Sequence, residues 1–223
     1  MLLACLHSLA APPDGELLRY AASWLGILAG TAEARTVVEN GVVQATIRTR
    51  SANWVAGIYP VDDVVVGTWT DAGSRHYSTR FREGGFQQDQ EMDFVDASVS
   101  VFRHQLIDRA WRDWTETYDV VSGLFDPVAS VYRLREPWGE HLSFAAFSGR
   151  KRVPISASRI GADSVENVLG LPTQKVGVMV EYDGHLKQWM TVWFAENSAR
   201  TPVRAVVETR GGPVTISLVE VGP

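Results

Sequence analysis

The chain has 223 residues, of which 45% are hydrophobic and 21% are charged, which is the balance of a soluble globular protein and not of a collagen-like, disulfide-rich or disordered chain. Its 21 basic and 26 acidic side chains give a net charge of −5, which disfavours nucleic-acid binding because that function needs clustered cations. No apolar run approaches the roughly 18 residues that a membrane-spanning helix requires, and a chain of this length holds a single core without metal or disulfide cross-links.

The first fifteen residues contain the only cysteine, so no intrachain disulfide can form. Leu2-Leu3-Ala4-Cys5 has the form of a bacterial lipobox, and the alanines before Pro12-Pro13-Asp14-Gly15 suit the passage from a signal to a linker. We expect residues 1–15 to be an export-signal stub or a disordered linker, and Cys5 to be a candidate for lipidation. The mature protein would then lie in the periplasm or outer envelope of a bacterium. If Met1 is the true start, the segment is a short tail on a cytoplasmic protein.

Turn dipeptides divide the rest of the chain, residues 16–223, at short intervals. Three of them tolerate the positive φ angles that tight hairpins need: Asn40-Gly41, Asp183-Gly184 and Gly211-Gly212. Asp71-Ala72-Gly73 and Gly84-Gly85 are weaker signals of the same kind. About a dozen strand candidates lie between the turns, and no linker divides them. The pattern predicts one mainly β domain, built as a curved antiparallel sheet or open half-barrel with two short helices packed on it.

The two helices are predicted at Ser51–Ile58 and after Asp126. The second has the clearer signals, because Asp126 is a good N-cap residue, Pro127 suits the first helical position and Pro137 ends the helix. Its expected buried face comprises Val128, Val131, Tyr132 and Arg135. Helices this short are not stable alone in water, so we expect both to pack on the sheet.

Four blocks of sequence occur in an order that matches a known family. They are Leu18-Arg19-Tyr20 with Ser23–Gly30, Trp54 with Ile58–Asp63, Asp126–Arg135, and Arg200–Arg204. Together they resemble the uncharacterised bacterial family catalogued as domain of unknown function 3108, from about Glu16 to Val221. The resemblance implies an exported, envelope-associated protein with a curved antiparallel sheet. It implies no reaction.

The familiar spacings of catalytic, phosphate-binding and zinc-binding motifs are missing, so we expect no catalytic residue, no metal and no cofactor. The adjacent carboxylates Asp62 and Asp63 could form a cation or acid–base site. The alternative is that one stabilises the local turn and the other pairs with an arginine, and turn chemistry favours this alternative. Asp89, Glu91 and Asp93 alternate along a strand, which predicts a solvated outer face.

Eight tryptophans are the remaining clue to function. Trp54 and Tyr59 on the first helix and Tyr132 on the second could line an apolar cleft beneath the sheet, although large rings also fill ordinary cores. The leading hypothesis is therefore a non-enzymatic envelope protein that binds an apolar or lipid-like ligand in the concave face. The alternatives are an envelope scaffold that holds a protein partner and has a filled core, and a hydrolase of unknown substrate. A large apolar cavity would favour the first, a packed interior with an exposed apolar patch the second, and a buried carboxylate–histidine pair the third.

Overall fold

The computed structural model describes residues 12–161, 165–182, 185–209 and 211–222. Fourteen strands form one antiparallel sheet in the order β8-β7-β6-β5-β4-β3-β2-β1-β14-β13-β12-β11-β10-β9, and the sheet is not closed into a barrel. The strands are β1 (Leu17–Trp24), β2 (Ile27–Glu39), β3 (Val42–Ser51), β4 (Asp62–Thr70), β5 (Gly73–Glu83), β6 (Phe86–Val95), β7 (Ser98–Ile107), β8 (Ala110–Asp119), β9 (His141–Phe147), β10 (Arg152–Gly161), β11 (Thr173–Tyr182), β12 (His185–Ala195), β13 (Pro202–Val207) and β14 (Val214–Gly222). The predicted fold class is confirmed, with fourteen strands where about a dozen were expected.

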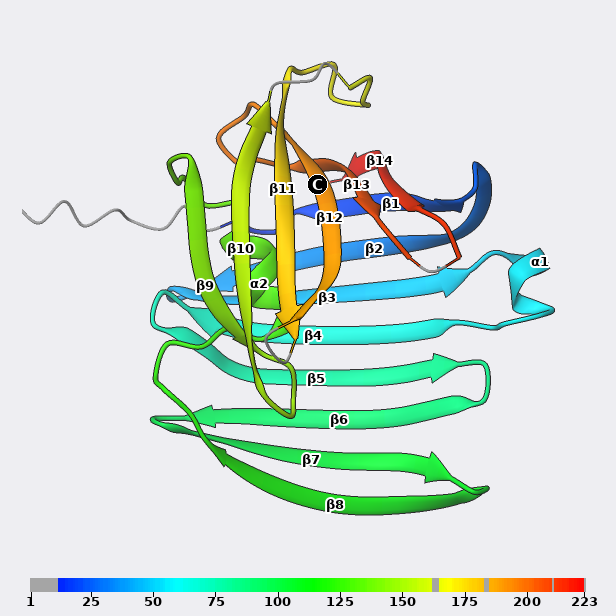
Figure 1. Cartoon of the computed structure of the whole chain (residues 1–223), viewed down its shortest axis with the longest axis vertical. Helices are drawn as coiled ribbons and strands as arrows, with labels where there is room; N and C mark the ends of the chain where they lie inside the picture. Colours follow the sequence, from blue (N-terminus) through cyan, green and yellow to red (C-terminus); the bar gives the residue numbers. More distant parts are fainter. Residues whose placement is uncertain (1–11, 162–164, 183–184, 210, 223) are drawn as a thin grey trace, which may run out of the picture.

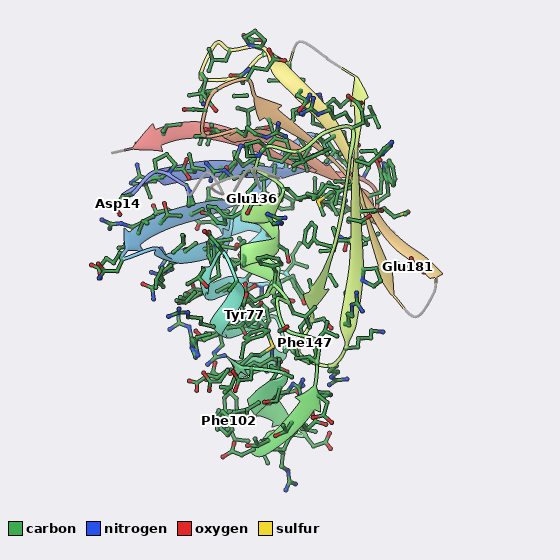
Figure 2. All side chains as sticks on the ribbon, turned by 90° about the vertical axis from the view of Figure 1, so that its left-hand side faces the viewer. Asp14, Tyr77, Phe102, Glu136, Phe147 and Glu181 are labelled. Atoms are coloured by element: carbon green, nitrogen blue, oxygen red, sulfur yellow. The ribbon has the colours of Figure 1, made fainter. Side chains whose placement is uncertain are left out.

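The sheet bends so that its two parts face each other (Figure 1). Strands β1–β8, which we call the wall, run side by side, and the front strands β9–β12 cross them at a steep angle. Helix α2 (Pro127–Arg133) lies between the two parts, as the perpendicular view in Figure 2 shows. The first and last strands of the sequence are neighbours, because β14 pairs along the length of β1.

The predicted turns join strands as expected. Asn40 and Gly41 have φ angles of 51° and 75° and connect β2 to β3. The glycine-containing turns at 71–73 and 84–85 connect β4 to β5 and β5 to β6. The strands on either side of Asp183-Gly184 pair with each other, although those two residues lie outside the described part of the chain. Turn chemistry therefore located the hairpins correctly.

The two helices depart from expectation in different ways. Helix α1 is only Asn53–Ala56, so Tyr59 lies beyond it. It packs against β2, as predicted, but none of its residues is buried. Helix α2 begins where predicted, since the Asp126 carboxylate accepts hydrogen bonds from the backbone N–H groups of Val128 and Ala129. Its predicted face is partly wrong, because Val131 is 44% exposed.

Helix α2 covers one end of the concave face of the wall. A core forms there between the wall, α2 and β9, and its buried members are Val43, Ala45, Trp69, Tyr77, Met92, Val99, Val101, Leu124, Val128, Ala129, Tyr132, Ala145 and Phe147. Gly67 of β4 permits the close approach of the helix, since a Cβ atom there would lie 2.8 Å from an Asp126 carboxylate oxygen and 2.9 Å from the Val128 Cβ. In Figure 2, Tyr77 and Phe147 lie between the wall and the front strands.

The hairpin between β9 and β10 is fastened to the wall by a buried arginine. Arg103 of β7 is 1% exposed, and its guanidinium donates hydrogen bonds to Gln90, Glu116 and the Gly149 carbonyl. A second core lines the inner side of the front strands, with members that include Val176, Val178 and Phe194. The outer face of the wall is polar, and cross-strand ion pairs such as Arg19 with Glu33 and Glu220 run along it.

Candidate functional site

The three aromatic residues predicted to line one cleft are not brought together. Tyr132 is 6% exposed, and its ring lies 5.0 Å from the ring of Trp69, centroid to centroid. The Arg135 guanidinium covers the same ring. Tyr132 is therefore part of the core beneath α2, and its ring has no free face of the kind that a ligand-binding residue needs.

Trp54 and Tyr59 lie at the other end of the wall, where they are 47% and 49% exposed. The Trp54 indole donates a hydrogen bond of 2.7 Å to the Leu28 carbonyl, which fixes α1 against β2. The Tyr59 ring lies against Gly84, where an added Cβ atom would come within 2.7 Å of the ring. Both rings are thus held in place while a large part of each remains open to solvent.

These two residues belong to a larger apolar surface, which we call the rim. In an antiparallel sheet the end of each strand lies beside the start of the next, so β1, β3, β5 and β7 all end at the edge where α1 lies (Figure 1). Within the described chain, ten exposed large apolar side chains gather at this edge: Trp24, Leu25, Ile27, Leu28, Trp54, Ile58, Tyr59, Phe86, Ile107 and Trp111. Ile58 is the most exposed, at 81%. Exposed apolar surfaces of this extent commonly mark interaction sites.

The rim continues into the concave face. Next to the core, six inward-facing residues of β1–β5 are only partly buried, although others on this face, such as Asp63 and Thr79, are buried. The six form what we call the concave strip: Ala22, Ala32, Ile47, Thr49, Val65 and Phe81. Most are small or apolar. The concave face therefore has a covered end beneath α2 and a partly open end that adjoins the rim.

Asp62 and Asp63 lie beside the strip but face opposite ways. Asp62 lies on the outer face near Arg48 and Arg50, and its pKa is lowered, since the hydrogen bond and charge of Arg50 and the charge of Arg48 outweigh the opposing effect of desolvation. Asp63 is buried and accepts a hydrogen bond from the Arg82 backbone N–H. Burial and the neighbouring Asp63 raise the pKa of Glu83. The predicted arginine partner of one aspartate is thus present, while the other supports the backbone of a neighbouring strand.

The outer face carries the remaining titratable groups that the sequence singled out. Asp89, Glu91 and Asp93 lie on the solvated side of β6, as predicted, and Asp89 and Asp93 pair with Arg82 and His76. His104 pairs with Asp113 on the same exposed face. Within the ranges that the structure describes, no three histidine, cysteine or carboxylate side chains are placed to share a metal ion.

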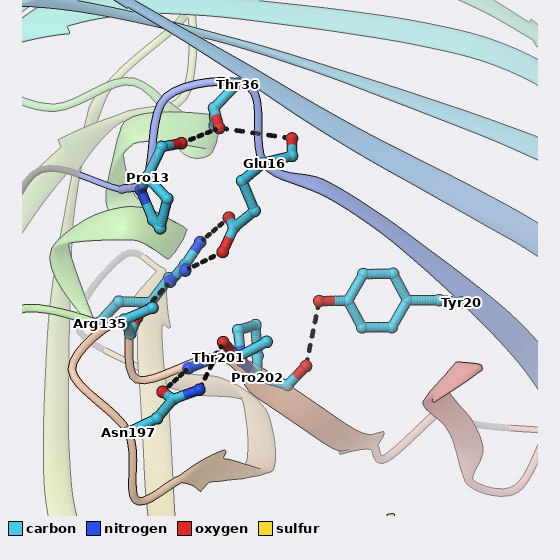
Figure 3. A network of polar contacts seen from close by, with 9 residues as sticks. Pro13, Glu16, Tyr20, Thr36, Arg135, Asn197, Thr201 and Pro202 are labelled. Atoms are coloured by element: carbon cyan, nitrogen blue, oxygen red, sulfur yellow. Dashed lines mark hydrogen bonds and ion pairs between the residues drawn. The ribbon is translucent and has the colours of Figure 1, made fainter. Parts of the chain in front are cut away.

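A buried ion pair joins the N-terminal strand to the end of α2. Arg135 donates two hydrogen bonds of 2.7 Å to the Glu16 carboxylate and a third to the Ala199 carbonyl (Figure 3). Burial opposes the charge of Arg135, but Glu16 outweighs this effect and raises the pKa of the guanidinium. Close by, the Tyr20 hydroxyl donates to the Pro202 carbonyl. Segments that are far apart in the sequence are therefore fastened together at one place.

This junction is where three of the four family blocks meet, namely 18–20, 126–135 and 200–204. The match is borne out over nearly the whole chain, since residues 19–219 correspond to the family described as a protein of unknown function, DUF3108. The chain belongs to this family. Within the DUF3108 fold the fourth block, which contains Trp54 and 58–63, forms part of the rim.

The fold of this DUF3108 chain resembles that of a solved structure. The beta-barrel-like protein of domain of unknown function DUF1849 from Brucella abortus superposes with a TM-score of 0.64 at 10% identity, over 95% of this chain and 99% of that one. The lipoprotein LppX from Mycobacterium tuberculosis gives a TM-score of 0.29 at 10% identity, over 92% and 85% of the two chains, which is too loose a match to carry an inference. No curated protein matches the sequence.

Two further observations concern membranes. Neither α1 nor α2 is long and apolar enough to cross a bilayer. Cys5, the lipidation candidate, lies outside the described residues.

Sequence reasoning missed the rim and the Arg135–Glu16 pair. One signal of the rim was present, because Leu25 lies within a turn and Ile58 precedes Pro60, and neither position gives an apolar side chain a strand face to occupy. The ion pair had no such signal, since its partners are 119 residues apart.

Proposed function

We propose that this protein is a non-enzymatic binding protein of the bacterial cell envelope, which takes up an apolar, lipid-like molecule at the rim and along the concave strip. The rim carries the proposal, because ten large apolar side chains remain in water at one edge of the sheet. Moving a large apolar side chain from full exposure to full burial is worth about 1.5–3 kcal/mol. The rim side chains are 39–81% exposed, so a part of this free energy is still available for binding a ligand.

The packing of the interior limits where the ligand lies. Trp69, Tyr132 and Phe147 fill the space beneath α2, so the ligand occupies the end of the concave face that adjoins the rim. Tyr132 is accordingly not proposed as a contact, whereas Trp54 and Tyr59 are.

A scaffold that binds a protein partner through the rim is the second candidate. The packed core beneath α2 favours it, because a filled interior beside an exposed apolar surface is typical of a protein–protein contact. A hydrolase has less support, since the described histidine–carboxylate pairs, His76–Asp93 and His104–Asp113, are exposed on the outer face.

An uncharged apolar dye, N-phenyl-1-naphthylamine, tests the ligand-binding proposal. The full chain is titrated with the dye and its fluorescence is followed. The variant Leu25→Asp/Ile58→Asp is expected to bind it at least about tenfold more weakly, because two charges are placed on the apolar surface. Val95→Asp is the matched control, since Val95 is 61% exposed at the opposite edge of the wall.

Failure of the dye to bind the wild-type chain, or equal binding by the rim variant and the wild type, would overturn the proposal in favour of the scaffold. The compartment is tested separately. Cells that express the gene with its full upstream region are fractionated, and recovery of the protein only from the cytosol would contradict an envelope location.

A further inference from the structure

Two arginines and one tryptophan from separate segments meet near the C-terminal end of α2. Trp138 lies in the connection from α2 to β9, Arg159 near the end of β10 and Arg200 in the turn from β12 to β13. The Cζ atoms of both arginines lie 5.5 Å from the centre of the Trp138 ring. Arg200 also lies 5.4 Å from the centre of the Phe194 ring. We propose that Arg159 and Arg200 form a binding site for an oxyanion, either a phosphate or a carboxylate group.

The first argument is charge. Three other arginines near the core each have a carboxylate partner: Arg103 pairs with Glu116, Arg133 with Glu136 and Arg135 with Glu16. Within the described residues, by contrast, no carboxylate forms an ion pair with Arg159 or Arg200. Burial and the nearby charge of Arg159 lower the pKa of Arg200, as expected for two cations held close together without a counter-charge.

The second argument is hydrogen bonding. The Nε atoms of both arginines and the Nη2 atom of Arg200 are buried without an acceptor. The Arg200 Nη1 atom donates to the neutral Gln174 side-chain oxygen at 3.1 Å, and the Arg159 Nη2 atom donates to the Trp138 carbonyl at 2.7 Å. Buried donors without partners are rare and costly, and several in one cluster indicate an absent acceptor. An oxyanion supplies both the negative charge and the lone pairs.

The third argument is the support given to these side chains. Arg200 has a left-handed backbone with a φ of 44°, which is strained for a residue with a side chain. Asn197 holds the turn, because its side chain bonds to both the backbone N–H and the hydroxyl of Thr201 (Figure 3). Trp138 is fixed by a hydrogen bond from its indole to the Leu134 carbonyl. The cationic groups are thus placed before any ligand arrives, which favours binding.

Solvent reaches the cluster, since Arg159 and Arg200 are both only partly buried. The nitrogen atoms without acceptors are enclosed. The Gln174 oxygen already accepts from Arg200 Nη1, so an anion that binds Arg200 competes with the Gln174 side chain. Replacing Gln174 should therefore ease binding, whereas a merely structural cluster would gain nothing from that change.

The test measures binding of inorganic phosphate to the full chain by isothermal titration calorimetry, at constant ionic strength with chloride as the competing anion. Arg159→Gln and Arg200→Gln are each expected to weaken binding by about tenfold or more, since each removes a charged donor. Gln174→Ala is expected to strengthen it. Arg35→Gln, which changes an exposed arginine on the outer face of β2, is the matched control and should bind as the wild type does.

Circular dichroism establishes that each variant is folded, and Arg200→Met, which also removes the charge, replaces Arg200→Gln if the latter is not. Decyl phosphate and decanol distinguish the source of the anion. Tighter binding of decyl phosphate than of inorganic phosphate, with loss in the arginine variants, indicates the headgroup of an amphiphile, and equal binding indicates a free anion. Absence of phosphate binding, or equal binding by the wild type and both arginine variants, would overturn the site. The dye titration at the rim uses an uncharged probe, so the two proposals can fail independently.

Discussion

The two ends of the concave face are made by the same strands, yet one is closed and the other is open. At the closed end, α2 and β9 lie on the wall, and Trp69 and Tyr77 are 7% and 5% exposed. At the rim end no buried residue of α1 covers the strands, and apolar side chains such as Leu25 and Ile27 are 62% and 58% exposed. The difference lies in what each end packs against, because strand pairs such as β2–β3 and β5–β6 are hydrogen-bonded in register up to both ends.

Hydrophobic content alone therefore does not identify a core in this fold. Both ends contain aromatic and aliphatic residues, but only one has a partner element that excludes water from them. Gly67 shows how specific that partnership is, since the helix approaches the wall where a side chain is lacking. Within the described chain, no helix or strand packs on the rim in this way. The free energy of burying its apolar side chains therefore remains available for binding another molecule.

Truncating one tryptophan at each end tests this difference most directly. Trp69→Ala should lower the free energy of unfolding by about 3–5 kcal/mol, because it leaves a cavity beneath α2. Trp54→Ala should cost about 1 kcal/mol or less, since nearly half of that side chain is already exposed and the main loss is one hydrogen bond to Leu28. Urea denaturation of both variants measures the contrast, and equal costs would show that the rim is as tightly packed as the core.

The second prediction concerns the buried ion pair between Glu16 and Arg135, whose loss should destabilise the closed end. Glu16→Gln removes the only carboxylate that contacts Arg135 among the described residues, and leaves a charge that is 5% exposed. Breaking a buried pair in this way costs about 3–5 kcal/mol. Replacing both partners, as in Glu16→Gln/Arg135→Met, should recover part of the loss. A double variant that is no more stable than the single one would contradict a mainly electrostatic cost.

Much of the fold could be predicted because its signals are local. Asn40-Gly41 specifies a hairpin through the φ angles of two adjacent residues, and Asp126 with Pro127 specifies the start of a helix. The candidate site could not be predicted in the same way. Whether Tyr132 and Trp54 share a cleft depends on which end of the wall α2 covers, and that depends on contacts such as Trp69 with Tyr132, which join distant parts of the chain.

Asp126 makes the stability of the closed end depend on pH. Burial raises the pKa of this carboxyl to about 6, although hydrogen bonds from Ser74, Ala129 and Val128 oppose the shift. Because the folded pKa is raised, the contribution of this group to stability is fully present below its unfolded pKa of about 3.9 and is lost as the pH rises through about 6. The substitution Asp126→Asn keeps a side chain that caps the helix but does not titrate.

The expected result is that the stability of the wild type relative to Asp126→Asn rises as the pH falls from neutral to acidic values, by an amount on the order of 2–3 kcal/mol. Thermal or urea unfolding of both proteins across this range measures the difference, and Asp108→Asn, at an exposed carboxylate in the turn between β7 and β8, is the control. A constant difference between wild type and Asp126→Asn would show that the capping carboxyl does not titrate in this range.

The smallest effect is expected at Val131, and it tests which side of α2 faces the wall. Val128 is 3% exposed and Val131 is 44% exposed, although the sequence pattern placed both on the buried side. The helix is only seven residues long, so its orientation is set by the contact of Val128 with Gly67 and not by an extended periodic stripe.

Val131→Asp should change the free energy of unfolding by about 1 kcal/mol or less, which reflects the lower helix propensity of aspartate. Val128→Asp should cost several kcal/mol, because it buries a charge without a partner. Denaturation curves that place the two variants at the same stability would mean that α2 packs on the wall with a different face.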